Sequence, residues 1–143
     1  MIFARRVFLI AAIYGVLVLV PQYFMEERVG REFPPAITHP EHFYGFIGVA
    51  LAWQALFFVI AGDPVRYRPA MLPAVVEKLA FGGAAVVLYL QGRLAAAVLG
   101  AGLIDLVLAV LFLAAYRLTP DLGAPDGSLD LDAYRRLIDW HVE

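Results

Sequence analysis

From Leu94 to Tyr116 the sequence reads LAAAVLGAGLIDLVLAVLFLAAY and contains one charged residue, Asp105. A helix of about 23 residues, rising about 1.5 Å per residue, extends about 34 Å and crosses the roughly 30 Å hydrocarbon core of a bilayer. Its apolar residues do not alternate with polar ones, which excludes a membrane-spanning strand. The segment is therefore predicted to be a transmembrane helix.

Three more apolar segments precede this one, and the four predicted transmembrane helices are residues 7–24, 43–61, 70–90 and 94–116. Residues 1–117 are therefore predicted to form an all-α, polytopic four-helix bundle. Arg5 and Arg6 ahead of the first apolar run also fit a signal peptide, but the bulky residues 21–25 offer no cleavage site, so we expect this helix to be retained. Residues 118–143 are predicted to be a cytoplasmic linker and a short amphipathic helix.

The composition agrees with a membrane protein. Of the 143 residues, 62% are hydrophobic and 17% are charged, whereas soluble domains are roughly 45–50% apolar. A formal net charge of -2 disfavours nucleic acid as a partner. The sequence has no cysteine, and it contains no HExxH, GxSxG or phosphate-binding glycine loop. We therefore expect no metal and no cofactor.

The distribution of arginines predicts the orientation in the membrane. One set of flanks carries Arg5, Arg6, Arg66, Arg68, Arg117, Arg135 and Arg136. On the other side Arg28 and Arg31 are outnumbered by glutamates. Because cytoplasmic loops are enriched in Lys and Arg, both termini are predicted to be cytoplasmic, in a bacterial inner membrane.

Asp105 is the most informative polar residue, because an ionisable side chain at mid-bilayer is costly unless it faces protein or water. Its helical face consists of small residues, which favours close helix packing, so Asp105 is expected to point into the bundle. No basic residue lies within two turns of it on its own helix. We therefore expect its carboxyl group to hold or share a proton at neutral pH. Lys78 is expected to extend to the cytoplasmic interface.

Each of the other helices contributes one further polar group, namely Glu77, Gln54 and Tyr14. Measured from the cytoplasmic boundary, these three lie roughly 6–10 Å deep and Asp105 roughly 16 Å. The overlap in depth predicts a small cavity that opens toward the cytoplasm. Two alternatives remain open: Glu77 can be a carboxylate favoured by its position in the first helical turns, and the others can hydrogen-bond between helices and set their packing.

A cluster of histidines and a carboxylate, His39-Pro40-Glu41-His42, has the residue types of a zinc site. We favour a different interpretation, in which Thr38 and Glu41 form a capping box that starts the second helix. Pro40 then occupies the first turn, where a missing N–H does no harm.

Four pieces of sequence, EHFYGFIGVALAWQ (41–54), AGDPVRYRP (61–69), EK (77–78) and ID (104–105), resemble small bacterial four-helix membrane proteins of the broad DoxX-like kind. This resemblance implies the fold and the membrane location, and it implies no catalytic residues. A weaker similarity exists to the EXPERA-type sterol isomerase and sterol-binding proteins, which also place carboxylates in a membrane cavity.

The leading hypothesis is an inner-membrane protein whose Asp105, Glu77, Gln54 and Tyr14 line a pocket for a small lipophilic molecule, such as a quinone, an isoprenoid or a lipid. The first alternative is an accessory or structural subunit that docks a partner protein through its C-terminal helix or forms a homo-oligomer. Two others are an enzyme that uses Asp105 as a general acid or base, and a proton-coupled transporter.

Overall fold

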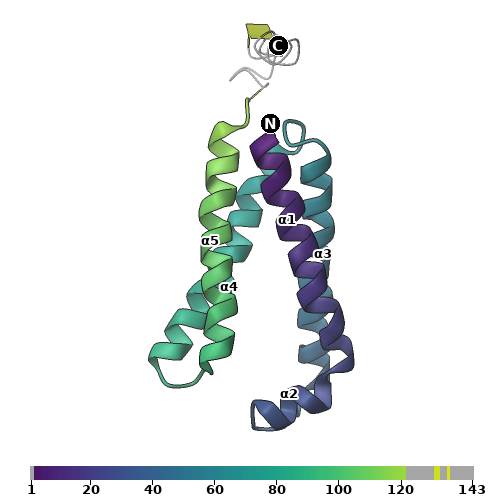
Figure 1. Ribbon diagram of the computed structural model, residues 1–143, viewed down its shortest axis with the longest axis vertical. Coiled ribbons are helices and arrows are strands. Elements are labelled where there is room, and N and C mark those ends of the chain that lie inside the picture. The colour runs from purple at the N-terminus through teal and green to yellow at the C-terminus, as the bar shows by residue number, and fades with distance from the viewer. Residues whose placement is uncertain (1, 122–130, 133–134, 136–143) are drawn as a thin grey trace.

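The protein is all-α in the part of the chain that the computed structural model describes, residues 2–121, 131–132 and 135. Its elements are α1 (Ile2–Leu19), the 3-10 helix η1 (Val20–Phe24), α2 (Glu26–Glu32), α3 (Pro40–Gly62), the 3-10 helix η2 (Arg68–Ala70), α4 (Met71–Leu90) and α5 (Ala96–Leu118) (Figure 1). The four long helices α1, α3, α4 and α5 correspond to the four predicted ones. The prediction of an all-α four-helix bundle is confirmed.

The observed helix ends differ from the predicted ones by a few residues, most clearly at the N-terminus. The first helix begins at Ile2, so Arg5 and Arg6 lie within it rather than ahead of it. Arginine is a good helix former, and its long side chain can leave the apolar region without interrupting the helix. The predicted amphipathic C-terminal helix lies, apart from Leu131, Asp132 and Arg135, outside the described residues.

Four segments of the described chain are long and apolar enough to cross a membrane: Ile2–Phe24, Pro40–Gly62, Arg68–Leu90 and Ala96–Leu118. Large apolar side chains point outward from all four, including Ile10, Leu17, Val49, Val76, Leu90 and Val110. Exposing such a large apolar surface to water would be strongly unfavourable. Contact with lipid chains carries no such cost, because the chains are as apolar as these side chains. The protein is therefore built as a multi-pass membrane protein.

The bundle consists of two helix pairs. α1 packs along α3, and α4 packs along α5. The pairs meet mainly through α1 and α5, while α3 and α4 touch each other little. The pairs lie close together near the N-terminus and separate toward α2 (Figure 1). We call the two ends of the bundle the basic end, which carries Arg5, Arg6, Arg66, Arg68 and Arg117, and the α2 end.

An aromatic core joins the pairs in the half of the bundle nearer the basic end. Phe8 of α1 stacks on Phe112 of α5 with ring centroids 4.1 Å apart. Phe57 of α3 meets Phe8 and Phe112 edge-on, at 5.8 and 5.0 Å. All three rings are completely buried. Aromatic pairs prefer these stacked and edge-to-face arrangements, and the core therefore fills this half of the bundle.

Glycines let α4 and α5 approach closely. A Cβ atom added to Gly82 would lie 2.7 Å from Leu106 Cδ2 and 2.8 Å from the Gly102 carbonyl oxygen. The connection between the helices also depends on a glycine, because Gly92 has a φ of 69°. There the Gly92 N–H donates to the Tyr89 carbonyl at 2.9 Å, and the next N–H, of Arg93, donates to Leu88 at 2.9 Å. This is the Schellman pattern that ends a helix in a tight turn.

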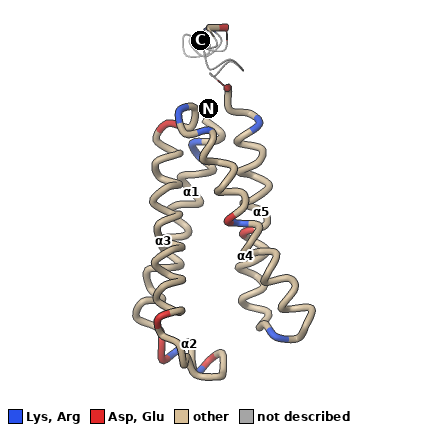
Figure 2. Tube along the Cα trace, turned by 180° about the vertical axis from the view of Figure 1, so that it is seen from behind, with Lys and Arg blue, Asp and Glu red and all other residues tan. Residues whose placement is uncertain are grey.

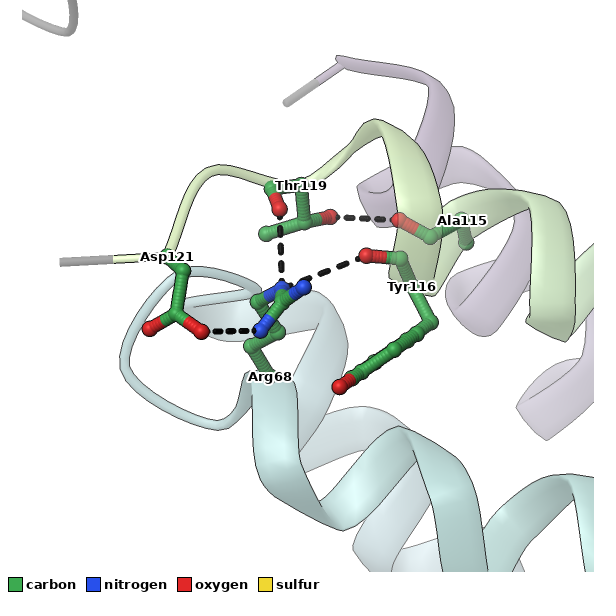
Figure 3. A network of polar contacts seen from close by, with 5 residues as sticks. All are labelled: Arg68, Ala115, Tyr116, Thr119 and Asp121. Carbon is green, nitrogen blue, oxygen red and sulfur yellow. Dashed lines mark hydrogen bonds and ion pairs between the residues drawn. The ribbon is translucent and has the colours of Figure 1, made fainter. Parts of the chain in front are cut away.

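Arg68 closes the basic end by binding the end of α5 (Figure 3). Its Nε donates to the carbonyls of Tyr116, at 3.2 Å, and Thr119, at 2.9 Å. Its Nη1 is 2.6 Å from Asp121 Oδ2, and the guanidinium lies 4.1 Å from the centroid of the Tyr116 ring. Carbonyls at a helix C-terminus lack partners within the helix. Arg68 therefore caps α5 and ties it to the start of α4.

We predict that Gly82→Ala lowers the free energy of unfolding in detergent by about 2 kcal/mol, the usual cost of overpacking a tight contact. The neighbouring Gly83→Ala is the matched control, since nothing lies within 4 Å of a Cβ at that position. Reversible unfolding of both variants in mixed micelles measures the difference. Equal stability of the two variants would show that the close α4–α5 approach is wrong.

Candidate functional site

Within residues 2–121, charged residues lie at the two ends of the bundle, with one exception about halfway along α4 and α5 (Figure 2). This exception is the carboxylate–lysine cluster, formed by Glu77 and Lys78 of α4 and Asp105 of α5. The Lys78 ammonium is 3.2 Å from both oxygens of Asp105. It lies 3.4 Å from Oε1 and 3.3 Å from Oε2 of Glu77. One ammonium thus bridges two carboxylates from neighbouring helices.

Lys78 differs from its predicted behaviour. Its side chain is 8% exposed and points inward, so the expected extension to the interface is wrong. Its Nζ lies 5.5 Å from the centroid of the Phe57 ring, which places the cluster directly beside the aromatic core. The expectation that Asp105 holds or shares a proton assumed that no cation was near, and the neighbouring helix supplies one.

A sequence signal for this pair does exist. Gly92 marks a tight turn between two antiparallel helices, and Lys78 precedes that turn by about as many residues as Asp105 follows it. Residues placed this way lie at the same depth on adjacent helices. Searching only along the helix that carries Asp105 missed the partner across the turn.

A cavity of about 470 Å³ lies between the two helix pairs on the α2 side of the cluster. All four predicted site residues, Tyr14, Gln54, Glu77 and Asp105, are among the residues that line it, together with Lys78. Most of the remaining walls are apolar: Val18 and Leu19 from α1, Phe46 from α3, Phe81 from α4, and Ala97 and Ala101 from α5. The cavity therefore has apolar walls and a charged floor.

The short helix α2 covers the far end of this interhelical cavity. Its Val29 and the following Phe33 contribute to the lining. The Tyr44 hydroxyl of α3 donates to Glu26 Oε2 at 2.7 Å, and Tyr44 also stacks on Tyr23 with centroids 6.0 Å apart. These contacts hold α2, through Glu26, and η1, through Tyr23, against α3 beside the cavity.

The position of the cavity corrects one prediction. A cavity open toward the cytoplasm was expected, but the half of the bundle nearer the basic end, which the arginine distribution predicts to be the cytoplasmic end, is filled by the aromatic core. The cavity instead extends toward the α2 end. Depth along the helices was sufficient to group the polar residues, but it carried no information about which half of the bundle is filled by Phe8, Phe57 and Phe112.

Gln54 is fully buried and packs directly against Gly15 of α1. The contact is so close that a Cβ atom added at Gly15 would overlap the Gln54 amide group. Its Nε2 donates to the Ala50 carbonyl of its own helix at 3.0 Å, and its Oε1 has no hydrogen-bond partner among the described residues. Gln54 therefore packs α3 against α1 by direct contact, without the hydrogen bond between helices that the packing alternative expected, and it also lines the cavity.

A second, shallower groove runs along the outer surface between α3 and α4. It is lined by apolar side chains, among them Val49, Trp53, Leu72 and Val76, with Glu77 as its charged residue. Phe46, Ala50, Glu77 and Phe81 line both the groove and the interhelical cavity. The cavity and the groove thus adjoin on the weakly packed α3–α4 side.

The chain can also be compared with known proteins. No family model, curated protein or solved structure matches it. The resemblance to DoxX-like proteins therefore stays a prediction.

The predicted capping box at the start of α3 is not formed. The helix begins at Pro40 with His39 as its N-cap, and no side chain caps it. Glu41 Oε1 instead lies 3.1 Å from His39 Nδ1, and the ring centroids of His42 and His39 are 5.4 Å apart. Ligand atoms of these three exposed residues lie within 4.8 Å of one another, so the metal alternative remains open geometrically.

We predict that Lys78→Met lowers the free energy of unfolding by about 3 kcal/mol, because removing one member of a buried ion pair leaves its partners' charges uncompensated. Arg93→Met, in the exposed turn between α4 and α5, is the control and should change stability little. In the double variant Lys78→Met/Asp105→Asn, part of the lost stability should return. Unfolding measured at neutral pH tests this, and purely additive single effects would contradict the cluster.

Proposed function

We propose that this protein binds a small lipophilic molecule in the interhelical cavity, with the apolar body of the molecule between the helix pairs and its polar end at the carboxylate–lysine cluster. The observation that carries the proposal is the combination of a cavity of about 470 Å³ with a buried charged floor. Ligand sites typically have volumes of about 300–1,000 Å³, apolar walls and a few polar groups that orient the ligand. A quinone, an isoprenoid or a lipid has the required shape.

The roles of the site residues follow from their contacts. Asp105 and Glu77 orient the polar end of the ligand. Tyr14 supplies a hydroxyl group on the opposite wall, from α1. Gln54 supports the site indirectly, because its amide holds α1 against α3. A lipophilic ligand would reach the cavity from the bilayer along the α3–α4 groove, where four residues line both spaces.

The accessory-subunit alternative also has an observation in its favour. Gln54 against Gly15, and Lys78 between two carboxylates, both lock helices together without any ligand. In that case the polar groups stabilise the bundle and a partner protein is bound elsewhere. The acid–base enzyme and the proton-coupled transporter would use the same Asp105 but require a substrate or a proton path as well. The first experiment below separates binding from these alternatives.

We further propose, from the arginine distribution, that the chain lies in a bacterial inner membrane with its basic end in the cytoplasm. The ligand would then bind from the outer half of the bilayer, because the cavity extends toward the α2 end. Membership of the DoxX-like proteins is part of the same proposal and accounts for the four-helix architecture.

We predict that gentle purification from native membranes, followed by native mass spectrometry, finds a small lipophilic molecule bound to the wild type. Ala101→Leu fills part of the cavity and should reduce the bound fraction at least about tenfold. Ala114→Leu lies on the same helix outside the cavity and should retain the ligand. Asp105→Asn should keep the fold and weaken binding.

Two results would overturn the proposal. Equal ligand content in the wild type and Ala101→Leu would place the molecule outside the cavity. A folded wild type that is empty after gentle purification, and that takes up no added lipophilic compound, would favour the accessory-subunit alternative.

The orientation has its own test, which the absence of native cysteine makes clean. We predict that a membrane-impermeant maleimide labels Glu27→Cys in α2 on intact cells and labels Gly62→Cys only after lysis. An added side chain at Gly62 meets no atom within 4 Å, so that substitution should leave the fold unchanged. The reverse labelling pattern would invert the proposed orientation.

A further inference from the structure

The carboxylate–lysine cluster has an unbalanced charge. When its three groups are ionised, two carboxylates face one ammonium. No charge on the other two long helices balances the excess carboxylate. The only Asp, Glu, Lys or Arg residues of α1 and α3 are Arg5, Arg6 and Glu41, and all three lie near the ends of these helices. The exposed fractions of the three side chains are only 16%, 8% and 12% for Glu77, Lys78 and Asp105. An uncompensated charge in a site so poor in water is costly, so a positive charge from an occupant would be favoured.

The hydrogen-bonding capacity points in the same direction. The Lys78 ammonium already donates to Asp105 and to Glu77, and its remaining side faces the ring of Phe57. The Lys78 ammonium therefore has few hydrogen-bond donors left for a ligand. The buried side-chain atoms without a hydrogen-bond partner in the described part of the chain are Glu77 Oε2 and Gln54 Oε1, and both are acceptors that belong to residues lining the cavity.

Glu77 Oε2 differs from Gln54 Oε1 in its surroundings, although both atoms are almost completely buried. It lies 3.3 Å from Lys78 Nζ but accepts no well-directed hydrogen bond from it. Glu77 also borders the α3–α4 groove, along which a molecule would enter from the bilayer. Gln54 Oε1, by contrast, is packed against Gly15. A donor group on an entering ligand would therefore meet the Glu77 carboxylate.

We infer that the cavity selects lipophilic molecules whose polar end is a protonated primary amine, such as an amine-bearing lipid, and that Glu77 is the residue that recognises this amine. The inference rests on the proposed function and specifies its ligand class. The amine supplies both the positive charge and the hydrogen-bond donors that the cluster lacks, and an aliphatic chain fills the apolar walls. Quinone carbonyls and carboxylate heads supply neither.

The test compares three probes with the same twelve-carbon chain, dodecylamine, dodecanol and dodecanoate, at equal mole fraction in non-ionic detergent micelles. The purified full-length protein is used, and binding is measured by the shift in unfolding temperature and by native mass spectrometry. We expect the wild type to bind the amine at least about tenfold more tightly than the alcohol, and the carboxylate most weakly. Glu77→Gln should remove the preference for the amine.

Glu41→Gln is the matched control, because it removes one exposed carboxylate at the start of α3 and should retain the preference. If Glu77→Gln fails to fold, Ala101→Leu replaces it and should weaken binding of the amine. Two results would overturn the amine inference and leave the proposed function intact. One is equal binding of the three probes to the wild-type cavity, and the other is preferential binding of the alcohol or the carboxylate. Binding of none of them would overturn both.

Discussion

A single ammonium group holds together the centre of this bundle. Lys78 of α4 contacts Asp105 of α5 and Glu77 of its own helix, at 3.2 to 3.4 Å, in a region from which lipid and protein exclude most water. Each of these groups alone would be costly at that depth, and together they are tolerated. The close approach of α4 and α5 at Gly82 and Gly102 brings the two helices near enough for the contact.

The cluster also marks the boundary between two different halves of the molecule. On its basic side, Phe8, Phe57 and Phe112 fill the space between the helices, and Arg68 closes the end by capping α5. On the other side the helix pairs separate, and the space is lined by small and apolar residues under α2. The helix pairs are thus joined by close packing in one half and enclose the cavity in the other. Function is proposed for the open half because that is where charge and free volume coincide.

The fold was largely predictable from the sequence because each membrane-spanning segment is recognisable by itself. The length of the apolar segments predicted all four long helices. The small residues around Asp105 correctly predicted that its side chain points into the bundle. The similar depth of the polar residues in the membrane correctly grouped Tyr14, Gln54, Glu77 and Asp105 around one cavity. That these residues bind a ligand remains a prediction. What failed depended on contacts between helices. Lys78 was expected to reach water, and the cavity was expected at the filled end, because a pattern along one helix does not identify the side chains opposite it.

The start of α3 shows a similar limit on a smaller scale. Thr38 and Glu41 have the spacing of a capping box, yet Glu41 pairs with His39. Spacing shows which contacts are possible, and the local competition between a backbone N–H and a nearby imidazole determines which one forms.

The tight turn at Gly92 has a consequence for how the protein enters the membrane. Glu77, Lys78 and Asp105 all belong to the single hairpin of α4 and α5, so one of the two carboxylate charges is compensated within one contiguous piece of chain. A nascent hairpin that pairs them during insertion presents one net charge to the lipid instead of three separate ones. The α1–α3 pair contributes none of these charges, so the ion pairs of the cluster form between α4 and α5 alone.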